Sequence, residues 1–363
     1  MMNEIISNTN ITVTPTQKSR IHEVDFENLL FGKKFSDHMF EQQYVDGQWQ
    51  EPIIKPFGKF EVTPAMNVFH YGQAIFEGMK AFYADENTVN IFRPKTHHDR
   101  FKFSGNRMCI PETDYETFID ALETLIRLDH QWVPKKPGTA LYIRPFIFAS
   151  EDFLAARSST KFTYQIITSP VGAYYAEGFN PVSLITSEKY VRAVEGGTGN
   201  VKTAGNYAAS FLPAQKAKEQ GYTQVLWLDA KEQKYIEEVG TMNIHFLIGD
   251  TLITPALNGS ILPGITRRSI IALAKEWGLN VEERKISLEE VFDAYEDGSL
   301  KEIFGSGTAA VVSPVGLINH NGRTIELDRE KPGEFAKKCF DAITDIQYGR
   351  KEDKYGWVHP VNI

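Results

Sequence analysis

Residues 195–207 read Glu195-Gly196-Gly197-Thr198-Gly199-Asn200-Val201-Lys202-Thr203-Ala204-Gly205-Asn206-Tyr207, so a single lysine is surrounded by small residues. Lysine becomes a nucleophile when it loses water and its pKa falls, and it can then form an imine with a carbonyl compound. Glycines weaken regular elements, so we expect these to let backbone or a flat ring come close. The stretch predicts a Schiff-base lysine at position 202, and a solvated lysine on a glycine-rich surface loop is the alternative.

A nucleotide-binding loop is a further alternative, because such loops also combine glycines with a lysine. That motif requires Gly-Lys-Ser/Thr in direct succession, whereas Asn200 and Val201 separate Gly199 from Lys202. An imine with pyridoxal phosphate is favoured if the chain also supplies three groups: a carboxylate for the pyridine nitrogen, a partner for the ring hydroxyl and a phosphate cup.

The composition is that of a folded globular protein, with 42% hydrophobic and 24% charged residues in 363. The net charge of -8 and the dispersed basic residues argue against a nucleic-acid partner. No apolar run approaches the roughly 18 residues of a membrane span, and residues 1–14 do not resemble a signal peptide. Cys109 and Cys339 predict neither a disulfide frame nor zinc, and the nine histidines lack metal-ligand spacing. We therefore expect a cytoplasmic protein without a metal site.

The length exceeds what one core supports, so two domains are expected. Residues 1–36 look like an irregular lead-in, 37–170 like a smaller α+β domain, 171–181 like a linker, and 182–363 like a larger, more regularly alternating domain that binds the cofactor. Asp46-Gly47 predicts a hairpin turn between residues 43–45 and 48–49. Helices are expected over 115–133, 207–220, 266–277 and 334–348, the last of which would close the chain. The adjacent His97 and His98 are interpreted as surface or packing residues.

Two kinds of partner for the lysine follow it in the sequence. Of the two acidic residues before Gly240, Glu238 is the candidate for the pyridine nitrogen, because Glu237 would face the other way in an extended segment. Residues 262–271 contain a Pro-Gly turn and Thr266 as a cap before an apolar-periodic helix, whose start favours anions. Residues 305–309 offer a second cup with the hydroxyl of Thr308. Each segment alone could be an ordinary turn or helix start, so their joint occurrence carries the prediction.

Six strings in order resemble the branched-chain amino acid aminotransferases, which are fold-type IV pyridoxal phosphate enzymes. They are residues 76–82 (Phe-Glu-Gly-Met-Lys-Ala-Phe), 141–145 (Leu-Tyr-Ile-Arg-Pro), 202–207, 237–243, 262–267 and 307–309. The resemblance runs from about Phe26 to the C-terminus. It implies the two-domain fold of D-amino acid aminotransferase, mixed α+β and α/β, and a homodimer.

The resemblance also implies roles for individual residues. For the cofactor, Lys202 forms the Schiff base and shuttles the proton, Tyr207 meets the ring hydroxyl, Glu238 meets the pyridine nitrogen, and the phosphate is held by Arg100, Ile265, Thr266 and Thr308. For the substrate, the carboxylate site has Thr241 and Ala309, and the distal carboxylate of glutamate meets Arg144. Leu154 belongs to a loop that reaches the neighbouring subunit's site. The side-chain pocket is lined by the aromatic residues Phe31, Tyr71, Phe76, Tyr142 and Tyr174. For Arg144, a salt bridge at a strand edge is the alternative.

The activity implied is reversible transfer of the amino group of L-leucine, L-isoleucine or L-valine to 2-oxoglutarate. A missing methylene changes binding by only about 1–3 kcal/mol, so all three donors are expected to react. Mammalian members carry a Cys-x-x-Cys pair where this chain has Ala310 and Ser313, so no thiol switch is expected. Within the same fold, a D-amino acid aminotransferase or an aminodeoxychorismate lyase is an alternative. A non-catalytic amino-acid- or phosphate-binding protein is an alternative of another class.

Overall fold

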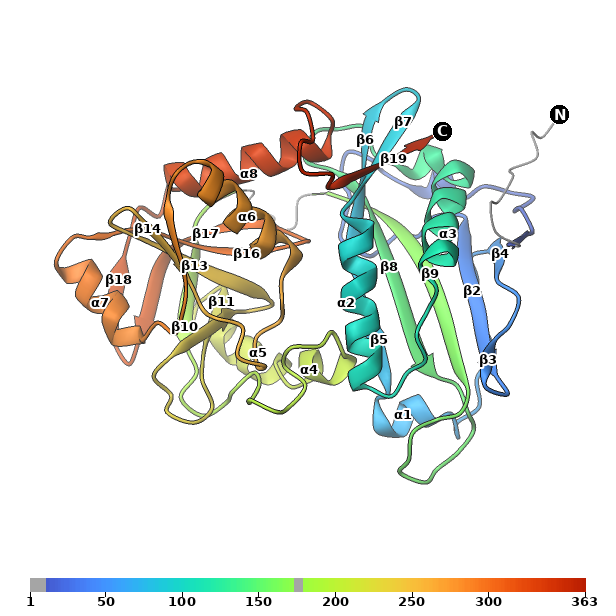
Figure 1. Ribbon diagram of the computed structural model, residues 1–363, viewed down its shortest axis with the longest axis horizontal. Coiled ribbons are helices and arrows are strands. Elements are labelled where there is room, and N and C mark those ends of the chain that lie inside the picture. Colours follow the sequence, from blue (N-terminus) through green and yellow to red (C-terminus); the bar gives the residue numbers. More distant parts are fainter. Residues whose placement is uncertain (1–10, 173–178) are drawn as a thin grey trace. The chain divides into compact units, whose positions relative to one another are not determined.

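The computed structural model describes residues 11–172 and 179–363 and divides them into two compact units (Figure 1). Unit 1 contains residues 11–172, Lys202–Ala204 and Asp345–Ile363, and unit 2 contains residues 179–201 and Gly205–Thr344. The chain thus leaves unit 1, enters unit 2, and returns to unit 1 for three residues that include the candidate lysine. No helix within the two described ranges is long and apolar enough to cross a membrane.

Unit 1 is built on a ten-stranded sheet with the strand order β1-β4-β2-β9-β8-β6-β7-β19, in which β3 pairs with β2 and β5 with β8. The strands are β1 (Thr12–Val13), β2 (His38–Val45), β3 (Gln48–Trp49), β4 (Ile53–Pro56), β5 (Ala74–Phe76), β6 (Met79–Asp85), β7 (Thr88–Phe92), β8 (Ala140–Ala149), β9 (Phe162–Val171) and β19 (Val358–Asn362). Its described pairings are antiparallel apart from that of β1 with β4. The first half of the chain therefore has the α+β character that the sequence indicated.

Two helices lie over one face of this sheet (Figure 1). The helical elements of unit 1 are α1 (Asn67–Tyr71), α2 (Pro94–Arg107), α3 (Tyr115–Leu128) and two 3₁₀ turns, Ile21–Glu23 and His130–Trp132. Helix α3 starts where Asp114 accepts a hydrogen bond from the N–H of Thr117, and it buries Phe118, Leu122 and Leu125. The core of unit 1 lies between this apolar face and the sheet.

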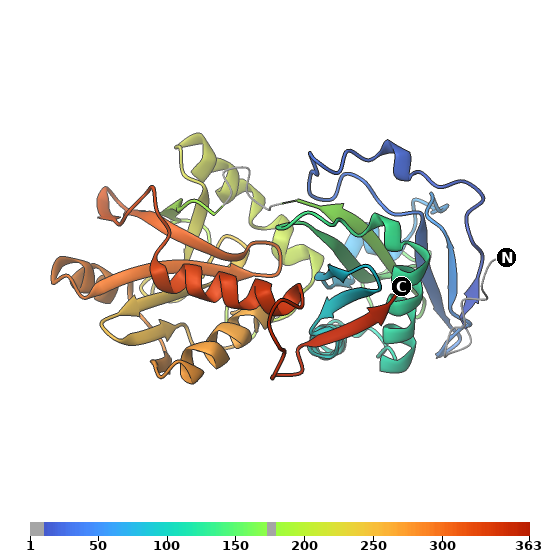
Figure 2. The ribbon, with the colours of Figure 1, turned by 90° about the horizontal axis from the view of Figure 1, so that it is seen from above.

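The structure contains the predicted hairpin turn, but the chain does not end in the predicted helix. The hairpin is confirmed: Asp46 and Gly47 have φ of 52° and 81°, as a tight turn between β2 and β3 requires. The prediction that a helix closes the chain is wrong. After that helix the chain continues to β19, which pairs antiparallel with β7 at the edge of the unit 1 sheet (Figure 2).

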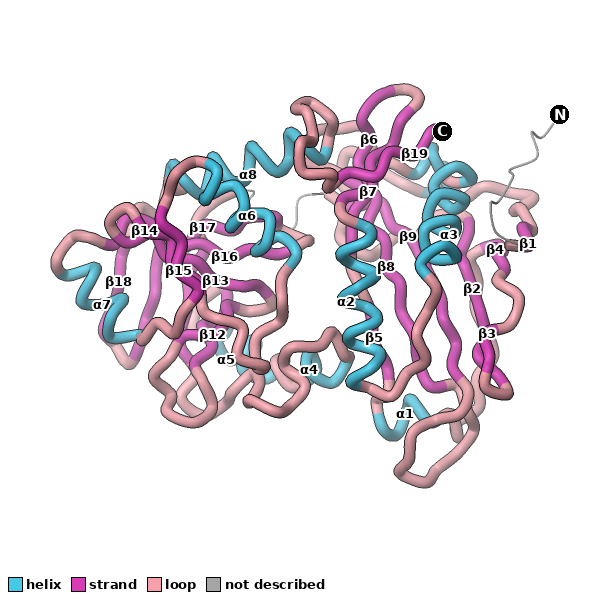
Figure 3. The backbone as a smooth tube through the Cα atoms, in the orientation of Figure 1, coloured by secondary structure: helices cyan, strands magenta, loops and turns pink. Residues whose placement is uncertain are grey.

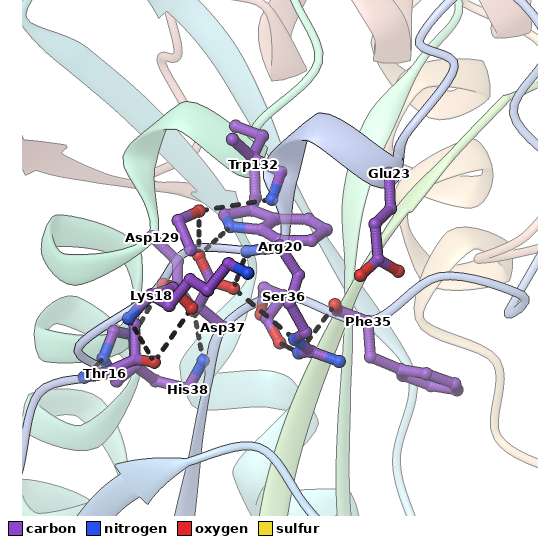
Figure 4. Close-up of polar contacts among 12 residues, drawn as sticks. Thr16, Lys18, Arg20, Glu23, Phe35, Ser36, Asp37, His38, Asp129 and Trp132 are labelled. Atoms are coloured by element: carbon purple, nitrogen blue, oxygen red, sulfur yellow. Dashed lines mark hydrogen bonds and ion pairs between the residues drawn. The ribbon is translucent and has the colours of Figure 1, made fainter.

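The segment before β2 is held down by a buried carboxylate (Figure 4). Asp37 is only 6% exposed and accepts hydrogen bonds from the Ser19 hydroxyl, the Arg20 backbone N–H and the Trp132 indole N–H. Beside it, His38 accepts from the N–H of Thr16. Within the described residues 11–36, the lead-in is therefore an ordered arm fixed by polar contacts.

Unit 2 is built on a nine-stranded sheet with the order β12-β11-β10-β17-β16-β13-β14-β15, in which β18 pairs with β17. The strands are β10 (Val182–Thr186), β11 (Gln224–Leu228), β12 (Ile236–Val239), β13 (Met242–Ile248), β14 (Thr251–Thr254), β15 (Asn280–Glu283), β16 (Leu300–Gly307), β17 (Val311–His320) and β18 (Arg323–Glu326). An additional pairing of β12 with β13 closes six of these strands into a ring around apolar side chains. The sheet mixes parallel and antiparallel pairs.

The helices of this half are α4 (Ala204–Ala208), α5 (Phe211–Glu219), α6 (Ile265–Glu276), α7 (Leu288–Glu296) and α8 (Glu334–Gln347), drawn in cyan in Figure 3. The single helix expected over 207–220 is wrong. The chain breaks at residues 209–210, and α5 restarts with Pro213 in its first turn, where proline costs no hydrogen bond. Helix α7 was not predicted, although Ser287 caps it by accepting from the N–H of Glu290, the Ser-x-x-Glu pattern of a helix start.

Candidate active site

Hydrogen bonds at Lys202 and Thr203 attach this three-residue segment to strand β5 and helix α2 of unit 1. The Lys202 carbonyl accepts from the N–H of Phe76 at 3.0 Å, and the Lys202 N–H donates to the Ser104 hydroxyl at 2.9 Å. The Thr203 hydroxyl donates to the carbonyl of Ala74 at 2.7 Å. The half-buried lysine is therefore held on a sheet and on α2, and the alternative of a solvated lysine on a loose surface loop is wrong.

Two cationic side chains of unit 1 lie at one aromatic ring. The Lys202 Nζ atom and the Arg144 Cζ atom are each 4.7 Å from the centroid of Phe76. A ring face attracts cations electrostatically, so Phe76 contributes to placing both groups. The lysine and the arginine are 58 positions apart in the sequence. The isolated bridge of Thr203 with Ile75 joins the lysine's segment to β5, and β5 pairs with β8, the strand of Arg144.

Arg144 lies among aromatic rings instead of in an ion pair. Its Nη2 atom donates to the Tyr142 hydroxyl at 3.0 Å, and Tyr142 in turn packs edge to face against Phe31 at 4.8 Å. The Arg144 Nε atom is buried and has no hydrogen-bond partner in the part of the chain that the structure describes. The strand-edge salt bridge considered above is not found among these residues. A half-buried guanidinium with an unused donor can bind a carboxylate.

The remaining predicted pocket residues do not all join this cluster. Tyr71 and Leu154, 44% and 61% exposed, contact each other through a hydrogen bond from the tyrosine hydroxyl to the leucine carbonyl. Tyr174 lies outside the described residues. Gly78 was not singled out for a contact, yet a Cβ atom there would lie 2.0 Å from the Tyr142 hydroxyl. Glycine at this position is therefore needed for Tyr142 to occupy its place.

Arg100, the predicted phosphate ligand, forms a buried pair with a residue that the sequence reasoning did not assign. Its Nε and Nη2 atoms contact the two oxygens of Glu77 at 2.7 and 2.9 Å, and Glu77 also meets His97 Nδ1 at 2.7 Å. Burial raises the pKa of Glu77, but the charge of Arg100 and the hydrogen bond of His97 outweigh it and hold that pKa well below its usual range. His97 and His98 are both buried, so they pack inside and are not surface residues.

Glu238 is a buried carboxylate of unit 2 with a partner on each oxygen. Its Oε1 atom accepts from the Asn243 side chain at 2.9 Å and from the Leu262 N–H at 3.2 Å, and its Oε2 atom pairs with Arg192 Nε at 2.6 Å. Glu238 is 3% exposed and lies within β12, so the alternative of a solvated acidic turn is wrong. Arg192 was missed because a partner 46 positions away leaves no local signal in the sequence. Asn243 was missed because it meets Glu238 only through the pairing of β12 with β13.

The start of α6 offers the anion site expected at residues 262–266, with one correction. The cap is Gly264, without a side-chain hydrogen bond, and Thr266 lies inside the first turn instead of capping it. A Cβ atom at Gly264 would lie 1.8 Å from Asn243 Oδ1, so only glycine permits this approach. The buried first residues Ile265 and Thr266 present N–H groups that no side chain caps, which suits a phosphate.

The other predicted residues of unit 2 lie in turns and in a short helix. Gly240 and Thr241 form the turn between β12 and β13, and Thr308 and Ala309 lie in the turn between β16 and β17. Tyr207 is a half-buried residue of α4. Gly199 lies so close to residue 260 that a Cβ atom would be 2.1 Å from the Ser260 carbonyl oxygen, which confirms that a glycine of the first stretch allows backbone to approach.

The donor set fits pyridoxal phosphate. Taken by itself, unit 1 contains a positioned lysine, the kind of group that the cofactor's aldehyde requires. Unit 2, taken by itself, contains a buried carboxylate and an uncapped helix start, the kinds of group that the pyridine nitrogen and the phosphate require. Within residues 11–172 and 179–363, no group of three His, Cys, Asp or Glu side chains could hold a metal ion. These are the kinds of group that imine-forming chemistry requires.

Residues 74–318 match the family model described as amino-transferase class IV. The chain belongs to this family. The class IV aminotransferase is 49% identical over 352 residues to branched-chain-amino-acid aminotransferase 2 of Bacillus subtilis strain 168. These aligned residues cover 97% of this chain and 96% of that protein.

Solved structures of aminotransferases share its fold. The branched-chain amino acid aminotransferase of Escherichia coli has a TM-score of 0.69 and 27% identity, covering 87% of this chain and 98% of that one. The holo, PLP-form enzyme of Thermobaculum terrenum has a TM-score of 0.72 and 24% identity, covering 89% and 98%. The fold-type IV architecture expected from the sequence is confirmed.

Proposed function

We propose that this class IV aminotransferase transfers the amino group of L-leucine, L-isoleucine or L-valine reversibly to 2-oxoglutarate, giving a branched 2-oxo acid and L-glutamate. The 49% identity to a branched-chain-amino-acid aminotransferase along 97% of the chain supports the assignment. The observation that carries it is the pair of cations at Phe76: a lysine able to form an imine and an arginine able to receive a second carboxylate share one ring.

Pyridoxal 5'-phosphate is the cofactor of this proposal, and the chain offers it the following groups. Lys202 bonds the aldehyde carbon, Tyr207 meets the ring hydroxyl, Glu238 meets the pyridine nitrogen, and the phosphate is held by the N–H groups of Ile265 and Thr266 with Thr308 and Arg100. When bound, the cofactor withdraws electrons from the α-carbon of the amino acid.

The chemical work of the protein is then done by two side chains. Glu238, held on both oxygens by Asn243, Leu262 and Arg192, keeps a proton on the ring nitrogen. The free Lys202 amine would take the proton from the substrate α-carbon and return it to the carbon on the other side of the substrate nitrogen. The keto acid leaves before 2-oxoglutarate enters, so ping-pong kinetics are expected.

The pocket must accept an aliphatic side chain and a glutamate side chain in turn. The faces of Phe31, Phe76 and Tyr142 suit the aliphatic group. A carboxylate buried there without a partner would be costly, and Arg144 offers it charge-assisted hydrogen bonds. We assign the substrate α-carboxylate to Thr241 and the turn at Ala309, and we keep Tyr71, Leu154 and Tyr174 as further lining residues in the proposal.

The purified protein tests the assignment directly. It should be yellow, lose this colour with borohydride and then carry the phosphopyridoxyl mass on Lys202. With 2-oxoglutarate it should use leucine, isoleucine and valine. Lys202→Ala should abolish exchange, and a variant that still moves nitrogen from leucine at full speed would refute the proposal.

The alternatives give different results in the same assays. Preference for D-amino acids, or production of 4-aminobenzoate, would identify the other activities of this fold. Substrate binding without turnover in the yellow protein would indicate a non-catalytic binding protein.

We further propose a cytoplasmic homodimer. The exposed Leu154, together with Phe69 at 59% exposure, supports an interface near α1. Light scattering of the purified protein should give twice the mass of 41.1 kDa, and a monomer at assay concentration would contradict the dimer.

A further inference from the structure

A loop of unit 1 presents Phe31, one of the residues assigned to the proposed side-chain pocket. Residues 24–35 form no helix or strand, yet the Phe31 ring packs edge to face against Tyr142, with 4.8 Å between the ring centroids. Phe31 is 37% exposed, so the body of the unit covers only part of it. The position of this ring therefore depends on the contacts that hold the loop.

The side chain of Arg20 joins the two ends of this loop (Figure 4). Its Nη2 atom donates to the carbonyl of Phe35 at 3.3 Å and to the carbonyl of Ser36 at 2.5 Å. Residues 21–34 are thereby closed into a short segment whose ends lie together, which is the form of an Ω-loop. We call this segment the Phe31 loop.

Arg20 is itself placed by an acid and two aromatic rings. Its guanidinium lies 5.1 Å from the centroid of Phe57, and Phe35 stacks on the same ring at 5.0 Å. Its Nε atom is 3.6 Å from Asp37, which also accepts from the Trp132 indole N–H. A planar guanidinium can meet a ring and donate to two carbonyls at once, which the point charge of a lysine does not reproduce.

The Phe31 loop also touches the body of unit 1 through Leu29 and Glu27. Leu29 lies against Gly172, where a Cβ atom would be 2.9 Å from the Leu29 carbonyl oxygen. Glu27 pairs with Lys136 at 2.6 Å, but both side chains are exposed and such pairs contribute little. Hydrogen bonds from a charged donor are stronger than neutral ones, so the contacts of Arg20 are the main hold on the ends of the loop.

We propose that Arg20 is a positioning residue for substrate binding, because by closing the Phe31 loop it holds the Phe31 ring against Tyr142 and so fixes one wall of the side-chain pocket. The inference rests on the proposed function, which supplies the substrate that this wall meets. Arg20 acts through the loop, so its effect belongs to the binding of the substrate side chain and not to the proton transfer at Lys202.

Steady-state kinetics of Arg20→Met with L-leucine tests this role. Methionine keeps an apolar stem near Phe57 but has no donor for the two carbonyls, and the Arg20 backbone N–H keeps its bond to Asp37. We expect KM for leucine to rise about threefold or more and kcat to change less than about twofold, the pattern of lost uniform binding. Arg20→Lys keeps a cationic donor without the fork, so its KM should be intermediate.

Lys136→Met is the matched control, because it removes the exposed ion pair with Glu27 on the same loop. Its KM for leucine should equal that of the unaltered chain.

A double-mutant cycle separates positioning from general destabilisation. If Arg20 acts through Phe31, Arg20→Met should change KM by less than about 1.5-fold when it is added to Phe31→Ala. Proteolysis gives a readout that needs no activity: trypsin should cleave after the exposed Lys33 or Lys34 about threefold faster in Arg20→Met than in the unaltered chain, because the loop opens more often.

The outcomes distinguish this inference from the proposed function. An unaltered chain that does not use leucine would refute the proposed function, and the cleavage rates would then decide whether Arg20 holds the loop. With an active unaltered chain, the inference is overturned by an unchanged KM in Arg20→Met, by an equal rise in KM with and without Phe31, or by unchanged cleavage in the loop.

Discussion

A half-buried arginine next to aromatic rings is central to the proposed substrate pocket. Arg144 contacts the faces of Phe76 and Tyr142 and has one donor without a partner in the described part of the chain. Its side chain thus covers apolar surface with a charge that no carboxylate of the described residues neutralises. The apolar part of such a side chain can pack against leucine, and its charge can bind the distal carboxylate of glutamate. The proposed two-substrate transaminase requires both interactions.

Arg144→Ala should therefore separate the two half-reactions. Losing a hydrogen bond to a charged group costs about 1.5–3 kcal/mol, so kcat/KM for 2-oxoglutarate should fall about 10- to 100-fold while that for leucine falls less. Steady-state kinetics with each substrate varied in turn measures the split. Arg144→Lys, which keeps the charge but not the planar fork, should give an intermediate loss. Equal losses for both substrates would remove the assigned role.

Helix α2 shows how an element can be fixed by polar contacts that leave little sign in its own sequence. Its buried face includes His97, His98 and Arg100, and Glu77 from the loop between β5 and β6 holds two of them. Removing one member of a buried ion pair leaves the other charge unpaired in a low-dielectric interior. The attachment of α2, and with it the Ser104 contact to Lys202, therefore depends on one carboxylate.

Glu77→Gln should lower the free energy of unfolding by about 3–5 kcal/mol, the usual cost of breaking a buried pair. Urea denaturation followed by circular dichroism measures it. Asp99→Asn is the matched control, because it breaks the exposed Lys95–Asp99 pair on the same helix and should cost at most about 0.5 kcal/mol. Similar effects of the two changes would show that Glu77 does not fix α2.

The arm before β2 is a second element, and one buried carboxylate, that of Asp37, accepts three of the hydrogen bonds that hold it. Asp37→Asn replaces an acceptor oxygen by a donor that faces the Ser19, Arg20 or Trp132 donors, so about 1–3 kcal/mol of local stability should be lost. Trypsin should then cleave after Lys18 or Arg20 faster than in the unaltered chain. Asp25→Asn, which changes only contacts within the arm, should leave cleavage unchanged. Unchanged cleavage in Asp37→Asn would show that other contacts hold the arm.

The elements differ in how much of them the sequence could predict. The local patterns of residues 88–92, 182–186, 251–254 and 280–283 predict extended segments, and these residues form β7, β10, β14 and β15 with the same bounds. Helix α2 was missed, because its buried positions are polar and their partners are distant. The same reason applies to the site: the motifs indicate Lys202 and Glu238, whereas Arg192 and Glu77 become visible only through the fold.

At the scale of the whole molecule, each unit contains a histidine that burial keeps neutral. Burial lowers the pKa of His98 in unit 1 to about 4 and that of His245 in unit 2 to about 3. The unfolded chain binds protons on these rings below about pH 6.5, whereas the folded units do not. Both units should therefore lose stability as the pH falls from 6.5 toward those values, and below about pH 4.5 protonation of Glu77 in the unfolded chain adds to the loss.

His245→Gln isolates the contribution of unit 2. His245 is fully buried, stacks on Phe304 and bonds to the Ser306 hydroxyl at 2.9 Å, which a glutamine amide can also meet. Between pH 6.5 and 5 the histidine should lower the free energy of unfolding by about 2 kcal/mol, at about 1.4 kcal/mol per pH unit. The glutamine side chain does not titrate. As the pH is lowered from 7.5 to 5, the variant's free energy of unfolding, measured with urea, should therefore fall by about 2 kcal/mol less than that of the unaltered chain. Parallel pH curves would mean that His245 is protonated in the folded unit, since every other titrating group is common to both proteins.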